Sequence, residues 1–158
     1  MAVLVNLPTL QKFQAKRTHG LKRHWKLRCK YWENMQKIDA NIILRYLMND
    51  NPQLSPKAKE IIEHNIVEVP VEVLCEVVYV LKGHYKIDRQ DFSSKLIQFF
   101  ELTQCSLTNR DAILEGLDYF GKYKLDFVDC LLAGYAKIEK DEIYTFDDNL
   151  ENLIKHIK

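Results

Sequence analysis

Residues 37–50 read KIDANIILRYLMND and join a short apolar strand to the start of a helix. We predict a strand over residues 37–39, followed at once by a helix that ends before Pro52. Four apolar residues in this stretch recur at the spacing of one helix face: Ile42, Ile43, Tyr46 and Leu47. A strand that runs directly into a helix is typical of the repeating unit of α/β domains.

The rest of the chain continues this alternation. Further strands are predicted over residues 66–69, 105–107 and 143–146, and helices over residues 55–64, 70–81, 88–102, 110–122, 126–140 and from near residue 149. Ser55 is expected to cap the helix that starts at Pro56. Alternating strands and helices pair in parallel through right-handed crossovers. The predicted fold is therefore α/β, a three-layer α/β/α sandwich with a mainly parallel four- to five-stranded sheet.

The composition is that of one globular domain. Of the 158 residues, 47% are hydrophobic and 28% are charged, which excludes a disordered chain. No apolar run approaches the roughly 18 residues that a membrane-spanning helix needs. The four cysteines are scattered, with no Cys-x-x-Cys pair, which suits free thiols in a reducing compartment. We therefore expect a cytoplasmic protein.

Two aspartates are predicted at the carboxyl ends of separate strands. Asp39 ends the first strand, and Asp147 directly follows the last one. Ligand chemistry in an open parallel sheet gathers at this edge, so both side chains are candidates for one shared site. The alternative for either residue is an ordinary turn or a helix cap, roles that aspartate often takes.

The helix predicted over residues 70–81 carries a third candidate. It is apolar at nearly every position except Glu72, Glu76 and Tyr79, which fall within one narrow sector at helical spacing. This sector is either a functional face or only the solvated face of a buried helix. Two acids four residues apart, without a basic partner, repel each other and favour the first interpretation.

The segment LDFVDCLLAGYA, residues 125–136, carries the fourth candidate, Asp129. We assign Asp126, in the same segment, to helix capping. Asp129 shares its helix face with Ala133 and Ala136. Such small residues are expected to let the helix approach the sheet closely, which would bring Asp129 towards the first strand.

Four acids that converge on one crevice repel each other unless protons or a cation bind there. Oxygen ligands without a nearby His or Cys select Mg²⁺ or Mn²⁺. A metal of this kind can polarise a phosphoryl oxygen and generate hydroxide from bound water. Neither GxxxxGK[ST] nor GxGxxG occurs in the chain, so phosphodiester hydrolysis is favoured over nucleotide binding.

Four segments resemble the motifs of PIN domains, in the order in which that family carries them. The segments are KIDANIILRYL, VPVEVLCEVVYVLKG, LDFVDCLLAGYA and TFDDNL, and together they span about residues 35–154. The residues at the motif positions are Asp39 with Asn41, Glu76, Asp129, and Thr145 with Asp147. Each motif is short and weak alone, but their order and the α/β alternation make the set fairly specific.

The resemblance implies roles for these residues. Asp39 and Asp129 would be the principal metal ligands. Glu76 and Asp147 would complete the acidic pocket and position a water molecule, and the Thr145 hydroxyl would form a hydrogen bond within the pocket. The subgroup with the strongest resemblance is the VapC toxins, which are ribonucleases of toxin–antitoxin systems.

The implied function is a Mg²⁺- or Mn²⁺-dependent endoribonuclease, with RNA as substrate, a cognate antitoxin as partner and a homodimer as assembly. The alternative is a catalytically silent PIN-like module that binds RNA or protein. A receiver-like domain or phosphatase is disfavoured, since no acidic pair stands at the first strand. The candidates for contacts with RNA phosphates are Arg45, Lys82, Lys86 and Lys124.

The basic charge is concentrated in a leader, residues 1–34, which carries eight Lys or Arg and one acid. The rest of the chain has 15 basic and 21 acidic residues. Three interpretations remain open: a nucleic-acid-binding arm, a disordered appendage, or a segment that is not translated. PIN domains usually start just before the first strand, here at Met35. We therefore favour a start at Met35, with residues 35–158 as the PIN-like domain.

Overall fold

The computed structural model describes residues 35–157, so the expectations about the leader lie outside the described residues. The described chain forms seven helices and three strands. The strands are β1 (Gln36–Lys37), β2 (Val67–Glu68) and β3 (Cys105–Ser106). The helices are α2 (Ala40–Met48), α3 (Ser55–His64), α4 (Val71–Gly83), α5 (Arg89–Leu102), α6 (Arg110–Lys122), α7 (Phe127–Ile138) and α8 (Asp148–Ile157). None of these helices combines the length and the apolar character needed to cross a lipid bilayer.

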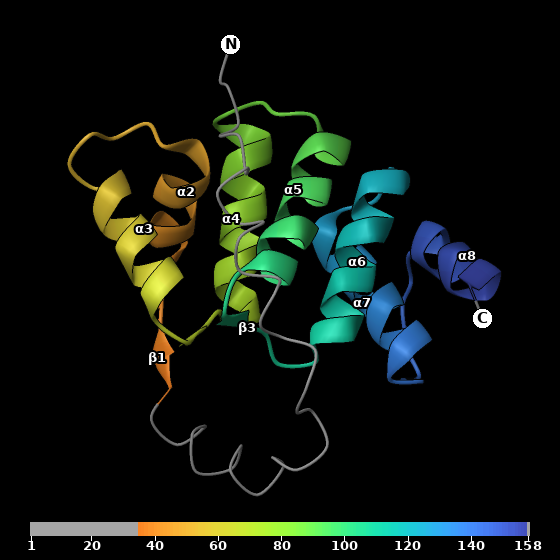
Figure 1. Cartoon of the computed structure of the whole chain (residues 1–158). Helices are drawn as coiled ribbons and strands as arrows, with labels where there is room; N and C mark the ends of the chain where they lie inside the picture. Colours follow the sequence, from red (N-terminus) through yellow and green to blue (C-terminus); the bar gives the residue numbers. More distant parts are fainter. Residues whose placement is uncertain (1–34, 158) are drawn as a thin grey trace, which may run out of the picture.

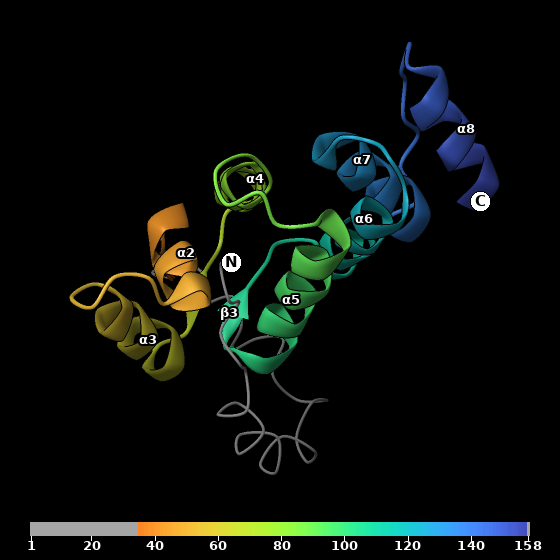
Figure 2. The same cartoon turned by 90° about the horizontal axis from the view of Figure 1, so that it is seen from above.

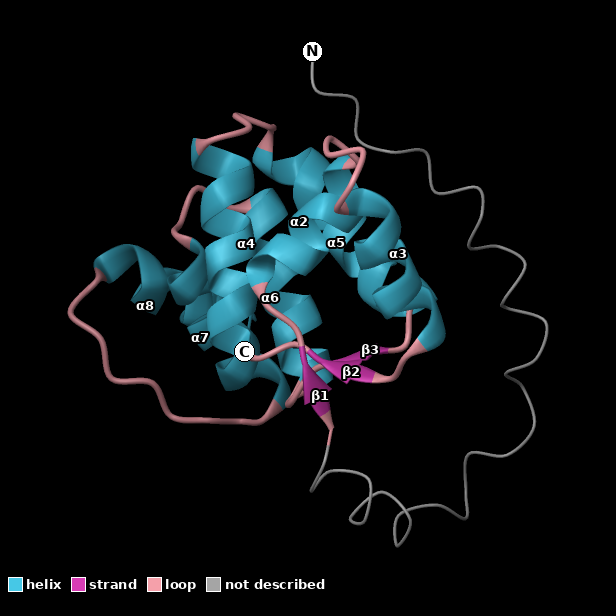
Figure 3. Ribbon diagram, turned by 90° about the vertical axis from the view of Figure 1, so that its left-hand side faces the viewer, coloured by secondary structure: helices cyan, strands magenta, loops and turns pink. Residues whose placement is uncertain are grey.

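The strands form one parallel sheet in the order β1–β2–β3. Val67 of β2 lies opposite Gln36 on one side and opposite Cys105 on the other. Figure 3 shows the three strands side by side at one end of the helical body. The α/β class and the parallel pairing were predicted correctly. The sheet is smaller than predicted, since the described residues form three strands of two residues each rather than four or five strands.

The predicted strand over residues 143–146 is absent, and this part of the prediction was wrong. Ile143 packs partly against the core, but the segment forms no ladder with β1, β2 or β3. It belongs to the connection between α7 and α8, at the opposite end of the molecule from α2 (Figure 1). Strand formation needs a partner for the backbone hydrogen bonds, and β-branched and aromatic composition does not supply one.

The helices pack mainly on their neighbours in the sequence. Helix α2 packs on α3 and α4, α5 on α6, α6 on α7, and α7 on α8. Figure 2, viewed from above, shows α2 and α3 on one side of the molecule and α8 on the other. The largest fully buried side chains come from most of these helices: Ile43, Ile62, Leu74, Phe92, Phe99, Ile113, Phe120 and Leu150.

Helices α6 and α7 make the closest contact between elements. A Cβ atom added at Gly134 would lie 2.2 Å from the backbone oxygen of Ala112, and one added at Gly116 would lie 3.0 Å from the Cα atom of Leu131. Ala133, beside Gly134, is also fully buried. Ala133 and Ala136 were predicted to bring α7 close to the sheet. The close approach that the structure shows is instead to α6, and Gly134 and Gly116 permit it.

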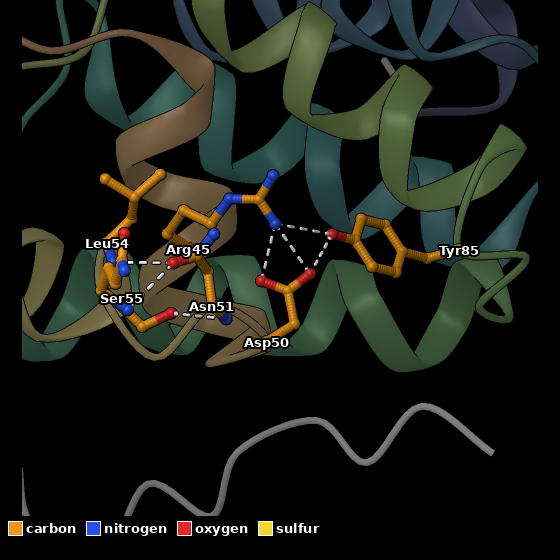
Figure 4. Close-up of polar contacts among 7 residues, drawn as sticks. Arg45, Asp50, Asn51, Leu54, Ser55 and Tyr85 are labelled. Atoms are coloured by element: carbon orange, nitrogen blue, oxygen red, sulfur yellow. Dashed lines mark hydrogen bonds and ion pairs between the residues drawn. The ribbon is translucent and has the colours of Figure 1, made fainter.

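The start of α3 differs from the prediction that Ser55 is its cap. Ser55 is the first residue of the helix, and its hydroxyl accepts a hydrogen bond from the backbone N–H of Asn51 (3.3 Å). The Asn51 side chain accepts from the backbone N–H groups of Gln53 (3.0 Å) and Leu54 (2.9 Å). Figure 4 shows the Asn51 contacts to Leu54 and Ser55 in one turn. The Ser55 hydroxyl therefore binds the preceding turn and does not cap the helix, and the Asn51 side chain stabilises the turn that leads into α3.

A polar cluster joins the end of α2 to the loop after α4 (Figure 4). Arg45 Nη1 donates to both carboxylate oxygens of Asp50, at 2.7 and 2.8 Å, and the Tyr85 hydroxyl donates to the same carboxylate at 2.6 Å. Burial alone would raise the pKa of Asp50, but the hydrogen bonds from Tyr85 and Arg45 outweigh it and lower the pKa. The carboxylate of Asp50 is thus the shared acceptor that holds the two segments together.

We expect Asp50→Ala to lower the free energy of unfolding by about 1–2 kcal/mol, because both donors lose their acceptor. Tyr85→Phe removes only one hydrogen bond and should cost about 0.5–1.5 kcal/mol. Urea denaturation at neutral pH measures both changes.

The folded-state pKa of Asp50 lies below its ordinary value of 3.8, so the stabilisation that Asp50 supplies is complete above pH 3.8. It is lost as the pH falls through the folded-state pKa. Equal stability of Asp50→Ala and the wild type at neutral pH would contradict the prediction.

Candidate active site

Asp39 lies at the carboxyl end of β1, as predicted, two residues after Lys37. Its side chain is exposed, and its Oδ1 atom accepts a hydrogen bond from the backbone N–H of Ile42 (3.0 Å). Asp39 is therefore the N-cap of α2, the alternative role considered for it. The second oxygen, Oδ2, has no protein partner within residues 35–157. A capping carboxylate of this kind retains one oxygen for a cation.

A cavity of about 360 Å³ lies at the carboxyl ends of the strands, where the sequence predicted the crevice. An ion pair between Lys37 Nζ and Glu68 Oε2 (2.8 Å) stands beside it. The lining residues are Lys37, Glu68, Pro70, Val71, Glu72, Thr108 and Tyr135. Glu72, rather than Asp39, is thus the unpaired acid that lines this cavity in the described structure.

Asp129 and Asp147 lie close enough for their charges to interact. Asp129 is half-buried in the first turn of α7. Burial raises its pKa, and the negative charges of Asp147 and Asp126 raise it further. Two of the four predicted acids are therefore brought together, with Asp126 beside them, in surroundings that disfavour negative charge.

The Thr145-x-Asp147 motif forms a local turn that fixes the second of these acids. The Thr145 hydroxyl accepts a hydrogen bond from the backbone N–H of Asp147 (3.0 Å). Asp147 Oδ1 accepts from the backbone N–H of Asn149 (2.7 Å) at the start of α8. Asp147 is thus a helix cap as well as a neighbour of Asp129, and its other oxygen has no bond within the described part of the chain.

Glu76 lies on α4, where it lines a groove of about 720 Å³ between α4 and α7. Glu72, Glu76 and Tyr79 are all exposed, so this sector of α4 faces solvent. Asp126 lines the same groove and pairs with Lys82 (Nζ–Oδ1, 3.3 Å). It occupies the N-cap position of α7, as predicted, but its side chain does not cap the helix. The sequence analysis missed this Lys82–Asp126 pair, since 44 residues separate the two.

The predicted acids do not all meet in the described structure. Helices α2 and α8, whose first turns follow Asp39 and Asp147, lie on opposite sides of the molecule (Figures 1 and 2). Across residues 35–157, no three His, Cys, Asp or Glu side chains are grouped so as to hold a metal ion. The structure therefore joins Asp129 to Asp147 and leaves Asp39 and Glu76 on other elements. The catalytic and metal-binding roles of the four acids stay predictions.

The donor chemistry of these side chains fits a divalent cation. Among the described ion pairs, none involves any of the four predicted acids: Asp39, Glu76, Asp129 and Asp147. Exposed or half-exposed carboxylates without a basic partner are the oxygen ligands that Mg²⁺ and Mn²⁺ prefer. The arrangement fits less well, because only Asp129 and Asp147 are brought together.

The predicted RNA-contacting basic residues divide into two groups. Arg45 and Lys82 are engaged with Asp50 and Asp126, so their charges are already balanced. Lys86 and Lys124 are exposed and form no ion pair with any described residue. These two lysines remain the candidates for phosphate contacts.

A family model described as PIN domain matches residues 38–155, which is most of the chain. The chain belongs to the PIN-domain family. The matched range contains all four predicted acids, and PIN domains are generally nucleases, so the family supports a nuclease that acts on nucleic acid. The small parallel sheet and the α/β order are consistent with a PIN fold. No curated protein and no solved structure matches this PIN domain.

Proposed function

We propose that this PIN domain is a divalent-metal-dependent endoribonuclease. The observation that carries the proposal is the family match, whose range includes Asp39, Glu76, Asp129 and Asp147 in the order of the family motifs. The crowding of charge around Asp129 supports it. Burial and two neighbouring acids disfavour the ionised form of Asp129, and a bound cation would relieve this repulsion.

In this proposal, Asp39 and Asp129 hold Mg²⁺ or Mn²⁺, while Glu76 and Asp147 complete the acidic pocket. A divalent metal bound there would polarise a phosphoryl oxygen and lower the pKa of a bound water molecule. The Thr145 hydroxyl fixes the turn that presents Asp147, through its bond to the Asp147 N–H. Asn41, exposed in the first turn of α2, has the supporting role that the motif implies.

The biological role we propose is that of the toxin in a type II toxin–antitoxin pair, of the VapC kind and active as a homodimer. A toxin restrained by a protein needs a surface for its antitoxin. The groove between α4 and α7, with exposed Tyr79 and Val128 at its walls, offers apolar surface of that type. Expression of the chain should arrest growth of the host. Normal growth during high-level expression of folded protein would count against a toxin.

A second candidate function is the catalytically silent PIN-like module that binds RNA or protein. The observation that favours it is the position of α2 and α8, the helices that begin directly after Asp39 and Asp147, on opposite sides of the molecule. A silent module would bind RNA without cutting it, with or without metal.

Cleavage of a structured RNA pool by the purified chain tests the two functions against each other. We expect cuts in the presence of Mg²⁺ or Mn²⁺ and none in EDTA, because the acids alone cannot stabilise the charge that develops on the phosphate. Asp39→Asn should abolish the cuts while leaving the fold intact by circular dichroism. RNA binding without any cutting, by folded and metal-loaded protein, would favour the silent module.

A further inference from the structure

The segment between α7 and α8 alternates between two environments. Ile143 and Thr145 are partly buried, and Ile143 packs against the core. Tyr144 and Phe146 are exposed, Tyr144 to 87% and Phe146 fully. Both aromatic rings are therefore open to solvent.

The exposure of Phe146 is exceptional among the phenylalanines of the described chain. The other phenylalanines of the described chain are all buried: Phe92, Phe99, Phe100, Phe120 and Phe127. Burial of a Phe side chain is worth about 1.5–3 kcal/mol, and the fold does not gain this at Phe146. Adjacent exposed aromatic side chains mark a surface that contacts another molecule.

The position of the rings relates them to the nuclease motif. Phe146 directly precedes Asp147, and Tyr144 directly precedes Thr145. The Thr145 hydroxyl accepts a hydrogen bond from the backbone N–H of Asp147, and the Asp147 side chain caps α8. Both ends of the turn are therefore fixed. A molecule that rests on the two rings therefore lies next to Asp147, one of the four predicted acids.

Two exposed aromatic rings suit unpaired bases. In a duplex the faces of the bases are covered by stacking on their neighbours, whereas the bases of a single strand are free to stack on a protein ring. Aromatic rings bind unpaired bases in this way with little dependence on sequence.

We propose that Tyr144 and Phe146 form a stacking platform for bases of single-stranded RNA next to Asp147. This inference rests on the proposed nuclease function and names the form of RNA that the site takes. Acidic residues flank the platform, namely Asp141, Glu142, Asp147 and Asp148. Contacts to phosphate are disfavoured there, so stacking supplies the affinity at this position. The platform's contribution is therefore insensitive to salt.

The test measures how tightly the full chain binds a fluorescently labelled single-stranded oligoribonucleotide. Binding is measured by fluorescence anisotropy, and EDTA is present so that the RNA is not cleaved. Tyr144→Ala and Phe146→Ala should each weaken binding by about fivefold or more. Tyr144→Phe keeps the ring and should keep the wild-type affinity. The same RNA annealed to its complement should bind the wild type and the alanine variants equally.

Leu54→Ala is the matched control, since Leu54 is an exposed apolar residue (48%) in the turn before α3, remote from the acids. The alanine effect should persist as salt rises. Photocrosslinking with 5-iodouridine RNA should attach the base to residues 144–146. Unchanged affinity in both alanine variants would overturn the proposal. A loss of self-association with unchanged RNA affinity would overturn it too, and would assign the rings to a contact between copies of the chain.

Cleavage assays with Mg²⁺ separate this inference from the proposed function. Ring-dependent RNA binding without cleavage would support the platform and reject the nuclease. Cleavage at the wild-type rate by the alanine variants would reject the platform and leave the nuclease standing.

Discussion

Asp129→Asn is expected to reduce the rate of metal-dependent RNA cleavage by about hundredfold or more. Loss of residues that only orient a metal ligand typically costs 10–100-fold, and loss of a ligand should cost at least as much. Asparagine keeps the shape of the side chain but removes the charge that a cation needs. Single-turnover cleavage at saturating Mg²⁺ measures the change.

The same substitution is expected to leave the fold at least as stable as the wild type. Burial and the charges of Asp147 and Asp126 raise the folded-state pKa of Asp129 above its ordinary value of 3.8. The folded protein therefore binds the proton more tightly than the unfolded chain does. Stability is favoured below pH 3.8 and falls as the pH rises through the folded-state pKa. The advantage of Asp129→Asn over the wild type should grow across this pH range and stay constant above it.

Asp148→Asn is the matched control for this substitution. Asp148 is exposed in the first turn of α8, directly after Asp147, and the family motif does not require an acid there. We expect Asp148→Asn to cleave RNA at close to the wild-type rate. Mg²⁺ should raise the melting temperature of the wild type and of Asp148→Asn, but not that of Asp129→Asn. Wild-type cleavage by Asp129→Asn would show that this acid is not a metal ligand.

Gly134→Ala is expected to lower the free energy of unfolding by about 2–3 kcal/mol. The added Cβ atom would lie 2.2 Å from the backbone oxygen of Ala112 and 3.0 Å from the backbone nitrogen of Gly116. Both contacts are with backbone atoms of α6, which cannot rotate away as a side chain can. Helices α6 and α7 would have to separate along their tightest contact.

Gly83→Ala is the control for this prediction, because a Cβ atom there meets nothing within 4 Å. Gly83 is the last residue of α4, and alanine is a better helix former by about 1 kcal/mol. Gly83→Ala should be neutral or slightly stabilising. Urea denaturation of both variants gives the comparison. Equal stability of Gly134→Ala and the wild type would mean that α6 and α7 are not packed as closely as described.

The sequence predicted the helices well because each has local signals. Asp88 was placed at the start of the helix over 88–102, and it caps α5 through the backbone N–H of Gln90 (2.9 Å). The predicted strand over 66–69 contains β2, since an apolar run there is stopped by Pro70. Hydrophobic periodicity, helix-capping residues and residues that break a helix or strand all act within a few positions of the chain. They can therefore be recognised without knowledge of the tertiary structure.

The errors arose where a partner distant in the sequence decides the outcome. Residues 143–146 have strand composition, but no strand lies beside them to complete a ladder. Ala133 and Ala136 were recognised as small residues of α7, but the close approach of this helix is made at Gly134 and is to α6. For the acids, the sequence placed Asp39 as the last residue of a strand and Asp129 in the first turn of a helix. Asp129 lies there, and Asp39 lies two residues after the end of β1. The sequence could not fix their separation, which depends on how all the helices pack.

Most of the helices pack on neighbours in the sequence, and this has a consequence for how the chain folds. Most backbone hydrogen bonds lie within single helices, and the sheet contributes only three two-residue strands. Contacts close in sequence form without the entropic cost of closing long loops, so folding should be fast, on the order of microseconds to milliseconds. Each helical hairpin can pack soon after it leaves the ribosome. Helix α8, with Asp147 at its start, packs on α7, so the approach of Asp147 to Asp129 also depends on a contact between helices that are neighbours in the sequence.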